Sequence, residues 1–194
     1  MLDTHARKYV NPIIELGADF FIKCNLNANQ VTIIALLLGI STSIFIYFDM
    51  SIIACIALWL SGYLDAVDGA VARKSKVSTS FGALLDILCD RIVEIGMILV
   101  LGLKNENVRL ELMILLACIL ISMTVFLTVG ALSEKNGIKS FYYQAGVAER
   151  SEGFILFSLM FLFQGYLNVL TNVFSLLILI TIGQRIFDAK KILN

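Results

Sequence analysis

The sequence has 194 residues, of which 59% are hydrophobic and 15% charged, with a mean hydropathy of +0.88 and a single proline. Apolar runs of helical length exclude an ordinary soluble domain and indicate a polytopic helical membrane protein. Fifteen basic and fifteen acidic residues cancel, so the chain lacks the positive field that nucleic-acid binding requires.

The first segment of the chain is polar with an apolar stripe. Residues 1–26 are expected on the cytoplasmic side of the membrane, and their mixed polarity argues against a cleavable signal peptide. Within them, residues 3–25 carry apolar side chains at helical spacing: Tyr9, Val10, Ile13, Ile14, Leu16, Phe20 and Phe21. This pattern favours an amphipathic helix lying at the membrane interface.

Six apolar stretches of helical length follow, and together they predict an all-α fold. The expected transmembrane helices cover residues 31–48, 51–73, 82–103, 108–132, 147–163 and 166–187. Short connections between them favour antiparallel neighbours, and we expect one domain over residues 1–194. The four cysteines lack the spacing of metal ligands and are interpreted as small residues of the membrane core: Cys24, Cys55, Cys89 and Cys118.

Lysine and arginine residues orient this predicted bundle, because cytoplasmic loops of membrane proteins are enriched in them. Twelve fall on the side of the two termini: Arg7, Lys8, Lys23, Arg73, Lys74, Lys76, Lys135, Lys139, Arg150, Arg185, Lys190 and Lys191. Only Lys104 and Arg109 fall on the other side, and Arg91 lies within a helix, where we expect it to form an ion pair. The sequence therefore predicts that both termini are cytoplasmic.

Three of the predicted spans contain too few apolar residues to cross a membrane by themselves. The second is apolar only over 52–63, the third mainly over 95–103 and the fifth over 154–163, whereas a span needs about twenty apolar residues. In each case the polar remainder lies in the cytoplasmic half. Polar side chains at that depth are tolerated where they face water or one another. We therefore expect a polar cavity that opens to the cytoplasm.

Four aspartates lie at the polar ends of the second and third spans. Asp65 and Asp68 are three residues apart and share a helix face, as do Asp86 and Asp90, which are four apart. An antiparallel turn between the helices would bring the two pairs together. Like charges in a small volume disfavour ionisation, and divalent cations are the simplest neutraliser. Carboxylate oxygens without nearby histidine favour Mg²⁺ or Mn²⁺ over Zn²⁺.

The residues between the aspartates are small, basic or hydroxylated. Gly69 and Gly82 would let a bulky ligand approach the backbone, or would serve helix packing. Arg73 and Lys74 can bind phosphate oxygens, although Lys74 also suits a solvated cytoplasmic turn. Paired metals held by carboxylates are a recurrent device for displacement at phosphorus.

The pattern Asp65-x-x-Asp68-Gly69-x-x-Ala72-Arg73, then eight residues, then Gly82-x-x-x-Asp86-x-x-x-Asp90, resembles the full signature of the CDP-alcohol phosphatidyltransferase family. All eight defining positions are present at the family spacing. The segment NANQVT, from Asn27 to Thr32, opens the first span and is similar to a family segment that usually carries proline at the place of Ala28.

The resemblance implies a transferase that acts on a CDP-linked donor and releases CMP. It implies that Asp65, Asp68 and Asp86 hold one metal ion, and that Asp65, Asp86 and Asp90 hold a second, with Asp90 also acting as general base. The positions that would contact the donor are Asn27, Ala28, Asn29, Gln30, Gly69, Ala72, Arg73, Thr79 and Gly82. A homodimer is also implied.

A second candidate site, for the acceptor, lies in the segment around Arg150. The segment "GVAERSEG", with Arg150, resembles the family segment that binds the acceptor's phosphate in phosphoinositol-type members. Gly153 and the stretch 129–134, which contains no basic residue, stand where those members carry further basic residues. The departure favours another small polar acceptor, such as glycerol 3-phosphate, serine or a sugar alcohol phosphate.

The leading hypothesis is phosphatidyl transfer from CDP-diacylglycerol to a small polar acceptor at the cytoplasmic membrane. One alternative reverses the partners, with a CDP-linked small alcohol as donor and a diacylglycerol-type lipid as acceptor. A more distant alternative is an ion-coupled transporter, which inverted repeats and broken helices would favour.

Overall fold

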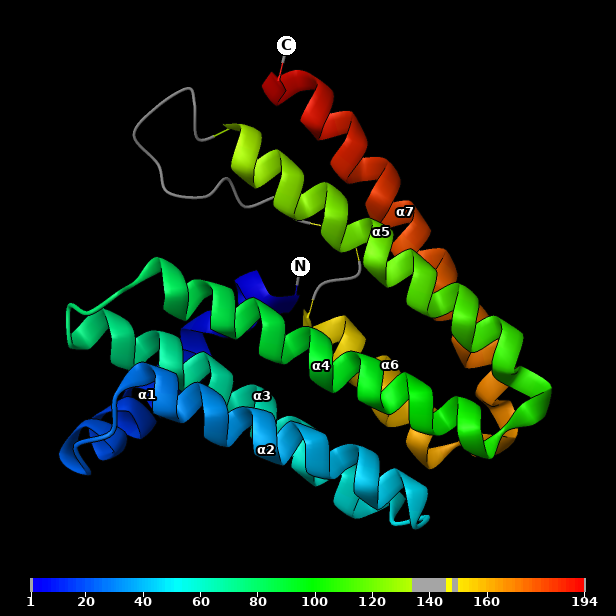
Figure 1. The fold of residues 1–194 in the computed structure, drawn as a ribbon, viewed down its shortest axis with the longest axis horizontal. Helices are drawn as coiled ribbons and strands as arrows, with labels where there is room; N and C mark the ends of the chain where they lie inside the picture. The colour runs from blue at the N-terminus through cyan, green and yellow to red at the C-terminus, as the bar shows by residue number, and fades with distance from the viewer. Residues whose placement is uncertain (1, 134–145, 148–149, 194) are drawn as a thin grey trace. The chain divides into compact units, whose positions relative to one another are not determined.

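The structure is a computed structural model that describes residues 2–133, 146–147 and 150–193, with side chains described from residue 10 onward. The described residues form helices and connecting turns and contain no strand. The chain divides into two compact units, His5–Glu106 and Asn107–Asn194, the latter together with Met1–Thr4. Figure 1 shows the first unit in blue to green and most of the second in yellow-green to red.

The first unit contains α1 (Leu2–Lys23), α2 (Ala28–Tyr47), α3 (Ser51–Lys74) and α4 (Ser80–Lys104). The second contains α5 (Arg109–Ser133), α6 (Arg150–Leu162) and α7 (Leu167–Leu193), with 3₁₀ turns η1 (Glu106–Val108) and η3 (Gln164–Tyr166) before α5 and α7. In the first unit α2 packs on both α3 and α4, and in the second α7 packs on both α5 and α6.

Each predicted span corresponds to one of the helices α2 to α7, and the differences lie at the ends. Helix α2 begins at Ala28 rather than 31 because Asn27 and Gln30 form a capping box, in which each side chain accepts a hydrogen bond from the other's backbone N–H. Helix α7 continues to Leu193, six residues past the expected end. The start of the fifth predicted span, at 147–149, lies partly outside the described residues.

Three successive helices end in the same hydrogen-bonded turn. Asn25, Asp49 and Lys76 follow α1, α2 and α3 with φ of 58°, 59° and 53°. In each case the next residue's N–H bonds back five residues, as from Val77 to the carbonyl of Ala72 at 3.2 Å. This is the Schellman arrangement, which satisfies the last carbonyls of a helix. The turn after α3 therefore has a defined geometry at the point where the chain reverses.

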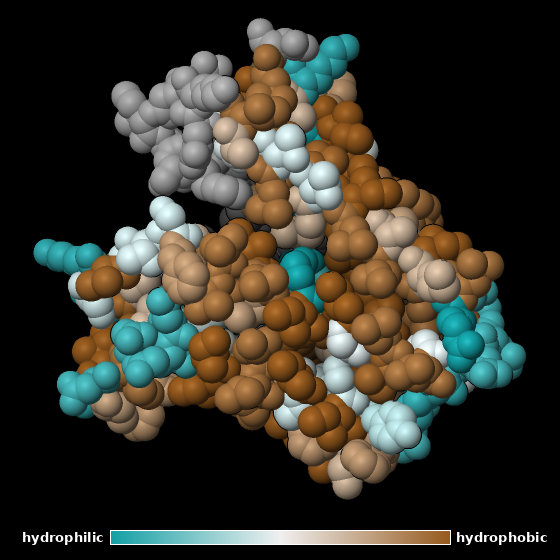
Figure 2. Space-filling model, viewed as in Figure 1, coloured by the Kyte–Doolittle hydropathy of each residue, from teal (hydrophilic) through white to brown (hydrophobic). Residues whose placement is uncertain are grey.

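Four helical stretches are long and apolar enough to span a membrane, namely Ala28–Tyr47, Ser51–Lys74, Glu106–Ser133 and Gln164–Leu193. Their exposed faces are apolar as well. Hydrophobic residues cover most of the described surface in the view of Figure 2, and Ile52 and Leu110 are each more than 65% exposed. Apolar surface on this scale is typical of a protein in lipid, and the chain is a multi-pass membrane protein.

Helices α2, α3 and α4 approach closely at glycines. A Cβ at Gly39 would lie 2.3 Å from Cγ2 of Val93 and 2.9 Å from Oγ of Ser61, so α2 touches both neighbours there. One turn earlier the Ser61 hydroxyl donates to the carbonyl of Ala35 at 2.8 Å. On α4, a Cβ at Gly96 would lie 3.0 Å from Oγ of Ser43. Small residues thus set the spacing of this unit, as expected of membrane helices.

We predict that Gly39→Ala lowers the stability of the protein by about 1–3 kcal/mol, because the added methyl collides with the stiff, buried Val93 side chain. The thermal unfolding midpoint in detergent measures this. Gly183→Ala is the control, since no described atom lies within 4 Å of a Cβ at that position. Equal midpoints for the two variants would contradict the close packing of α2 on α4.

Candidate functional site

The functional site is built from the facing ends of α3 and α4. Asp65 and Asp68 lie on the last turns of α3, and Asp86 lies on the second turn of α4. One carboxylate oxygen from each of the three lies within 4.8 Å of the other two. The predicted meeting of the two aspartate pairs is therefore confirmed for three of its members.

These three carboxylates suit a hard divalent cation. Two oxygens on opposite sides of Mg²⁺ are about 4.2 Å apart, at about 2.1 Å from the ion, so small side-chain adjustments would bring all three into one coordination sphere. Asp68 is buried, and Asp65 and Asp86 are partly buried. The donor set is oxygen only, which matches the preference of Mg²⁺ and Mn²⁺. The three aspartates can hold a metal ion.

Asp90 follows Asp86 by one helical turn on α4 and is partly exposed. It is not one of the three carboxylates that lie together. The next turn carries Glu94, which forms an ion pair with Arg91, and both side chains are roughly three-quarters buried. The expected ion pair of Arg91 is therefore confirmed, and Glu94 is its partner.

A hydroxyl group from α2 reaches this cluster. The Thr32 hydroxyl lies 2.6 Å from Oδ2 of Asp68, and both residues are buried. Thr32 closes the segment of residues 27–32 that resembles the family's, but its contact with Asp68 was not predicted, because the rotation of α2 against α3 decides which side chains of α2 reach α3.

The first turn of α2 borders an open pocket of about 460 Å³. The pocket is lined by Asn27, Asn29, Gln30, Ile33 and Ile34. Three of these five belong to the segment predicted to contact the donor. Ala28, the other residue of this turn that is predicted to contact the donor, instead packs against the cluster of Ala18, Val31, Val67, Ala70 and Val71.

The two signature glycines differ from the packing glycines of the fold. A Cβ at Gly69 would meet only Nη1 of Arg73 within 4 Å among the described atoms, and one at Gly82 would meet Oδ1 of Asn29 at 3.1 Å and Oγ1 of Thr79 at 3.2 Å. Neither approaches the backbone of another helix in the described part of the chain. Gly82 instead brings the polar ends of α2 and α4 together.

Thr79 has a structural partner in addition to its predicted role. Its hydroxyl oxygen accepts a hydrogen bond from the N–H of Gly82 at 3.0 Å, so Thr79 is the N-cap of α4. Ala72 is partly buried and Arg73 is exposed at the end of α3. All three predicted positions thus frame the turn between the aspartate pairs.

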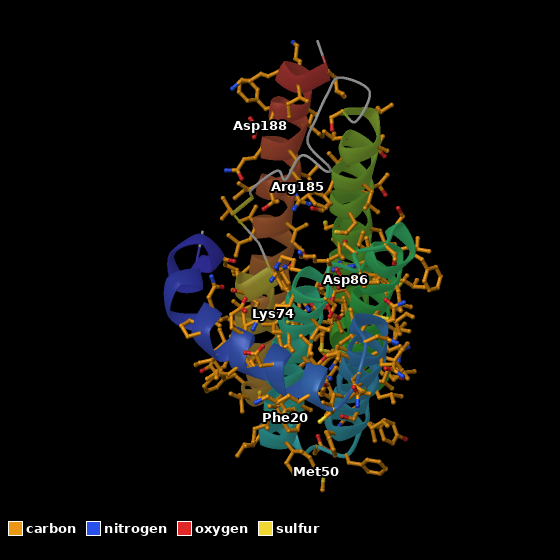
Figure 3. All side chains as sticks on the ribbon, turned by 90° about the vertical axis from the view of Figure 1, so that its left-hand side faces the viewer. Phe20, Met50, Lys74, Asp86, Arg185 and Asp188 are labelled. Carbon is orange, nitrogen blue, oxygen red and sulfur yellow. The ribbon has the colours of Figure 1, made fainter. Side chains whose placement is uncertain are left out.

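Lys74 contacts α1, which neither interpretation of the sequence anticipated. Its ammonium group lies 2.8 Å from a carboxylate oxygen of Glu15 and 2.6 Å from one of Asp19, and it donates to the Glu15 carbonyl at 3.2 Å. Figure 3 shows α1 (dark blue) passing Lys74. The Tyr63 hydroxyl also donates to the Ile13 carbonyl at 3.0 Å. Helix α1 is therefore attached to the part of α3 that carries the aspartates.

The apolar stripe predicted for the first segment divides between two faces. Ile14 and Phe21 pack against the core beside α3, while Ile13, Leu16 and Phe20 are exposed.

Two arginines belong to the unit of residues 107–194. Arg150 begins α6, and its guanidinium lies 5.5 Å from the centre of the Phe154 ring. Arg185 on α7 donates to the carbonyl and the hydroxyl of Ser122 at 3.1 and 3.0 Å and lies 4.9 Å from the Phe126 ring. From the sequence, Arg185 was predicted only to be a positive charge on the cytoplasmic side. Glu149, beside Arg150, lies outside the described residues.

Comparisons with known proteins agree with this site. A family profile described as CDP-alcohol phosphatidyltransferase matches residues 25–183. Over 191 residues the chain is 30% identical to the archaetidylinositol phosphate synthase of Pyrococcus horikoshii, an alignment that covers 98% of this chain and 97% of that protein.

Solved structures share the fold. The phosphatidylinositol phosphate synthase of Mycobacterium tuberculosis with CDP-DAG bound gives a TM-score of 0.72 at 21% identity, covering 92% of this chain and 94% of that one. The same synthase in complex with manganese and citrate gives 0.70 at 21% identity, covering 89% and 87%. Since the profile spans most of the chain and the archaeal relative aligns along nearly all of it, the protein is an enzyme of the CDP-alcohol phosphatidyltransferase family.

Proposed function

We propose that the protein transfers a phosphatidyl group from CDP-diacylglycerol to a hydroxyl of a small polar acceptor and releases CMP. The observation that carries the proposal is the cluster of Asp65, Asp68 and Asp86, whose oxygens lie within 4.8 Å of one another beside polar helix ends. The solved relative with CDP-DAG bound supports this choice of donor.

The metal ligands would be divided between two ions of Mg²⁺ or Mn²⁺. Asp65, Asp68 and Asp86 would hold the first, and Asp65, Asp86 and Asp90 the second. The solved relative in complex with manganese supports a divalent cation of this kind. When bound, such ions neutralise the charge of a diphosphate and of the departing nucleotide.

Asp90 is the proposed general base. Its carboxylate takes the proton from the acceptor hydroxyl, whose oxygen forms a bond to the phosphorus that carries the diacylglycerol. The bond from this phosphorus to the bridging oxygen breaks, and CMP leaves with that oxygen. A positioned carboxylate within hydrogen-bond reach is suited to this proton transfer.

The donor's nucleotide would occupy the pocket at the start of α2. Asn27, Asn29 and Gln30 line it, and Ala28 is part of the same turn. Across from them, the nucleotide and the phosphates would contact residues at the end of α3 and the start of α4, namely Gly69, Ala72, Arg73, Thr79 and Gly82. A Cβ at Gly69 would meet only Nη1 of the Arg73 side chain within 4 Å among the described atoms, and no atom of a neighbouring helix, which supports ligand approach there rather than helix packing.

Arg150 is proposed to contact the acceptor, at its phosphate where the acceptor carries one. Full-length similarity to an archaetidylinositol phosphate synthase makes inositol phosphate a necessary member of any acceptor panel. Glycerol 3-phosphate, serine and other sugar alcohol phosphates complete it, because Gly153 and the neutral end of α5 differ from the phosphoinositol pattern.

The protein is proposed to lie in the cytoplasmic membrane as one functional domain over residues 1–194, possessing six transmembrane helices (α2 to α7). The excess of lysine and arginine on one side supports cytoplasmic termini and a cytoplasmic active site. Helix α1 would lie at the membrane interface, with Ile13, Leu16 and Phe20 towards lipid. A homodimer is proposed from the family resemblance.

The direct test is an activity assay of the protein purified in detergent. CDP-diacylglycerol, Mn²⁺ or Mg²⁺ and each acceptor of the panel are added, and CMP release is measured. We expect metal-dependent release with one acceptor and none after chelation by EDTA. Release only from a CDP-linked small alcohol, with diacylglycerol as acceptor, would reverse the donor and acceptor.

We predict that Asp90→Asn lowers turnover about 10²- to 10⁴-fold, the usual contribution of a general base. The protein should keep its unfolding midpoint. Asp188→Asn, an aspartate near the end of α7 and outside the signature, is the matched control and should retain turnover. Full activity of Asp90→Asn would exclude the assigned base.

We predict that Gly82→Ala raises the KM for the donor about tenfold, which corresponds to about 1.4 kcal/mol. The added methyl would lie 3.1 Å from Oδ1 of Asn29 and displace it from the pocket edge. Alanine favours the helix over glycine, so stability should not fall. Gly183→Ala is assayed as the control. An unchanged KM in Gly82→Ala would show that Gly82 does not belong to the donor site.

A further inference from the structure

Thr32 on α2 donates its hydroxyl to a signature aspartate, Asp68 on α3. We infer that Thr32 is a positioning residue of the metal centre: its hydroxyl holds the Asp68 carboxylate in the orientation that the cluster requires. The inference rests on the proposed metal site and extends it to a residue on a different helix.

The geometry of the contact is that of a strong, charge-assisted hydrogen bond. The Thr32 hydroxyl lies 2.6 Å from Oδ2 of Asp68 and 3.0 Å from the carbonyl oxygen of Ala28 in its own helix. A hydroxyl has one proton to donate. The shorter distance falls in the range for an O–H donor to a carboxylate, about 2.5–2.7 Å, so the proton is assigned to Asp68.

Burial makes this bond important for the orientation of Asp68. Thr32 is 4% exposed and Asp68 is 6% exposed. Water has little access to either side chain, so solvent cannot readily replace the hydroxyl as donor. A carboxylate that loses a buried hydrogen-bond partner is free to rotate or must find another partner, at a cost in free energy.

Four other buried hydroxyl groups bond within their own helices. Those of Thr42, Thr171, Ser175 and Thr181 donate to a carbonyl four residues earlier in their own helix. That bond is the default for a hydroxyl inside a membrane helix. Thr32 has the same acceptor available, yet its shorter contact is with the aspartate of α3.

Thr32 also connects two parts of the proposed site. It lies two residues after Gln30, whose side chain lines the pocket at the start of α2, and it contacts a proposed metal ligand on α3. Partners that orient metal ligands typically change metal affinity by 10- to 100-fold when they are removed. We expect the same range here.

The test measures Mn²⁺ binding without substrate, from the electron paramagnetic resonance signal of free Mn²⁺ in titrations of detergent-purified protein. Thr32→Val keeps the shape of the side chain and removes its hydroxyl, and we expect its Mn²⁺ dissociation constant to rise 10- to 100-fold. Thr32→Ser keeps the hydroxyl and should retain an affinity close to that of the unmodified protein.

Thr42→Val is the matched control. Thr42 is equally buried on the same helix, but its hydroxyl donates within α2, to the Leu38 carbonyl at 3.5 Å. Its Mn²⁺ affinity should not change. Unfolding midpoints of all variants are measured on the same samples, so a general loss of structure is recognised.

Turnover at increasing Mn²⁺ gives a second measurement. If Thr32 acts by positioning Asp68, excess Mn²⁺ should restore much of the turnover of Thr32→Val. Unchanged Mn²⁺ affinity in Thr32→Val, with only a lower unfolding midpoint, would overturn the inference and leave the proposed function intact. Failure of the unmodified protein to bind Mn²⁺ would overturn the metal centre itself, and the inference with it.

Discussion

The concentration of negative charge among apolar helices is the constraint on which this structure depends. Three carboxylates with oxygens within 4.8 Å of one another repel, and burial adds a desolvation cost to each charge. A divalent cation relieves both effects. Two features of the residues around the cluster fit this constraint. The Thr32 hydroxyl donates to the Asp68 carboxylate, and a Cβ at Gly69 would meet only the Arg73 side chain within 4 Å among the described atoms.

Helix α3 is held on several sides near its functional end. Helix α2 contacts it through Ser61 and Thr32. Helix α1 contacts it through Tyr63 and through the ion pairs of Lys74 with Glu15 and Asp19. Individual exposed ion pairs contribute little to stability, but several contacts together fix the rotation of α3. The aspartates on its last turns are thereby presented in one defined direction.

Much of the fold follows from sequence because apolar runs and turn residues mark the helices directly. The six apolar helices lie where periodicity placed them, and the spacing of Asp65, Asp68 and Asp86 predicted their meeting. Contacts between helices were not predictable in the same way. The partners of Lys74 and Thr32 depend on the rotation and separation of whole helices, which no local pattern encodes. The start of α2 at Ala28 could have been predicted from the sequence, since Asn27 and Gln30 have the spacing of a capping box.

The eight residues between Arg73 and Gly82 determine which side of α4 faces α3, because almost all of them belong to hydrogen-bonded helix ends. Residues up to Val77 belong to the turn that ends α3, and residues from Thr79 belong to the cap that begins α4. Only Ser78 lies between these two closures. Each inserted residue in a helix turns the following side chains by about 100°, so an insertion taken up at the start of α4 would swing Asp86 away from Asp65. The eight-residue spacing between Arg73 and Gly82 therefore sets the side of α4 on which Asp86 lies, and with it the meeting of Asp86 with Asp65 and Asp68.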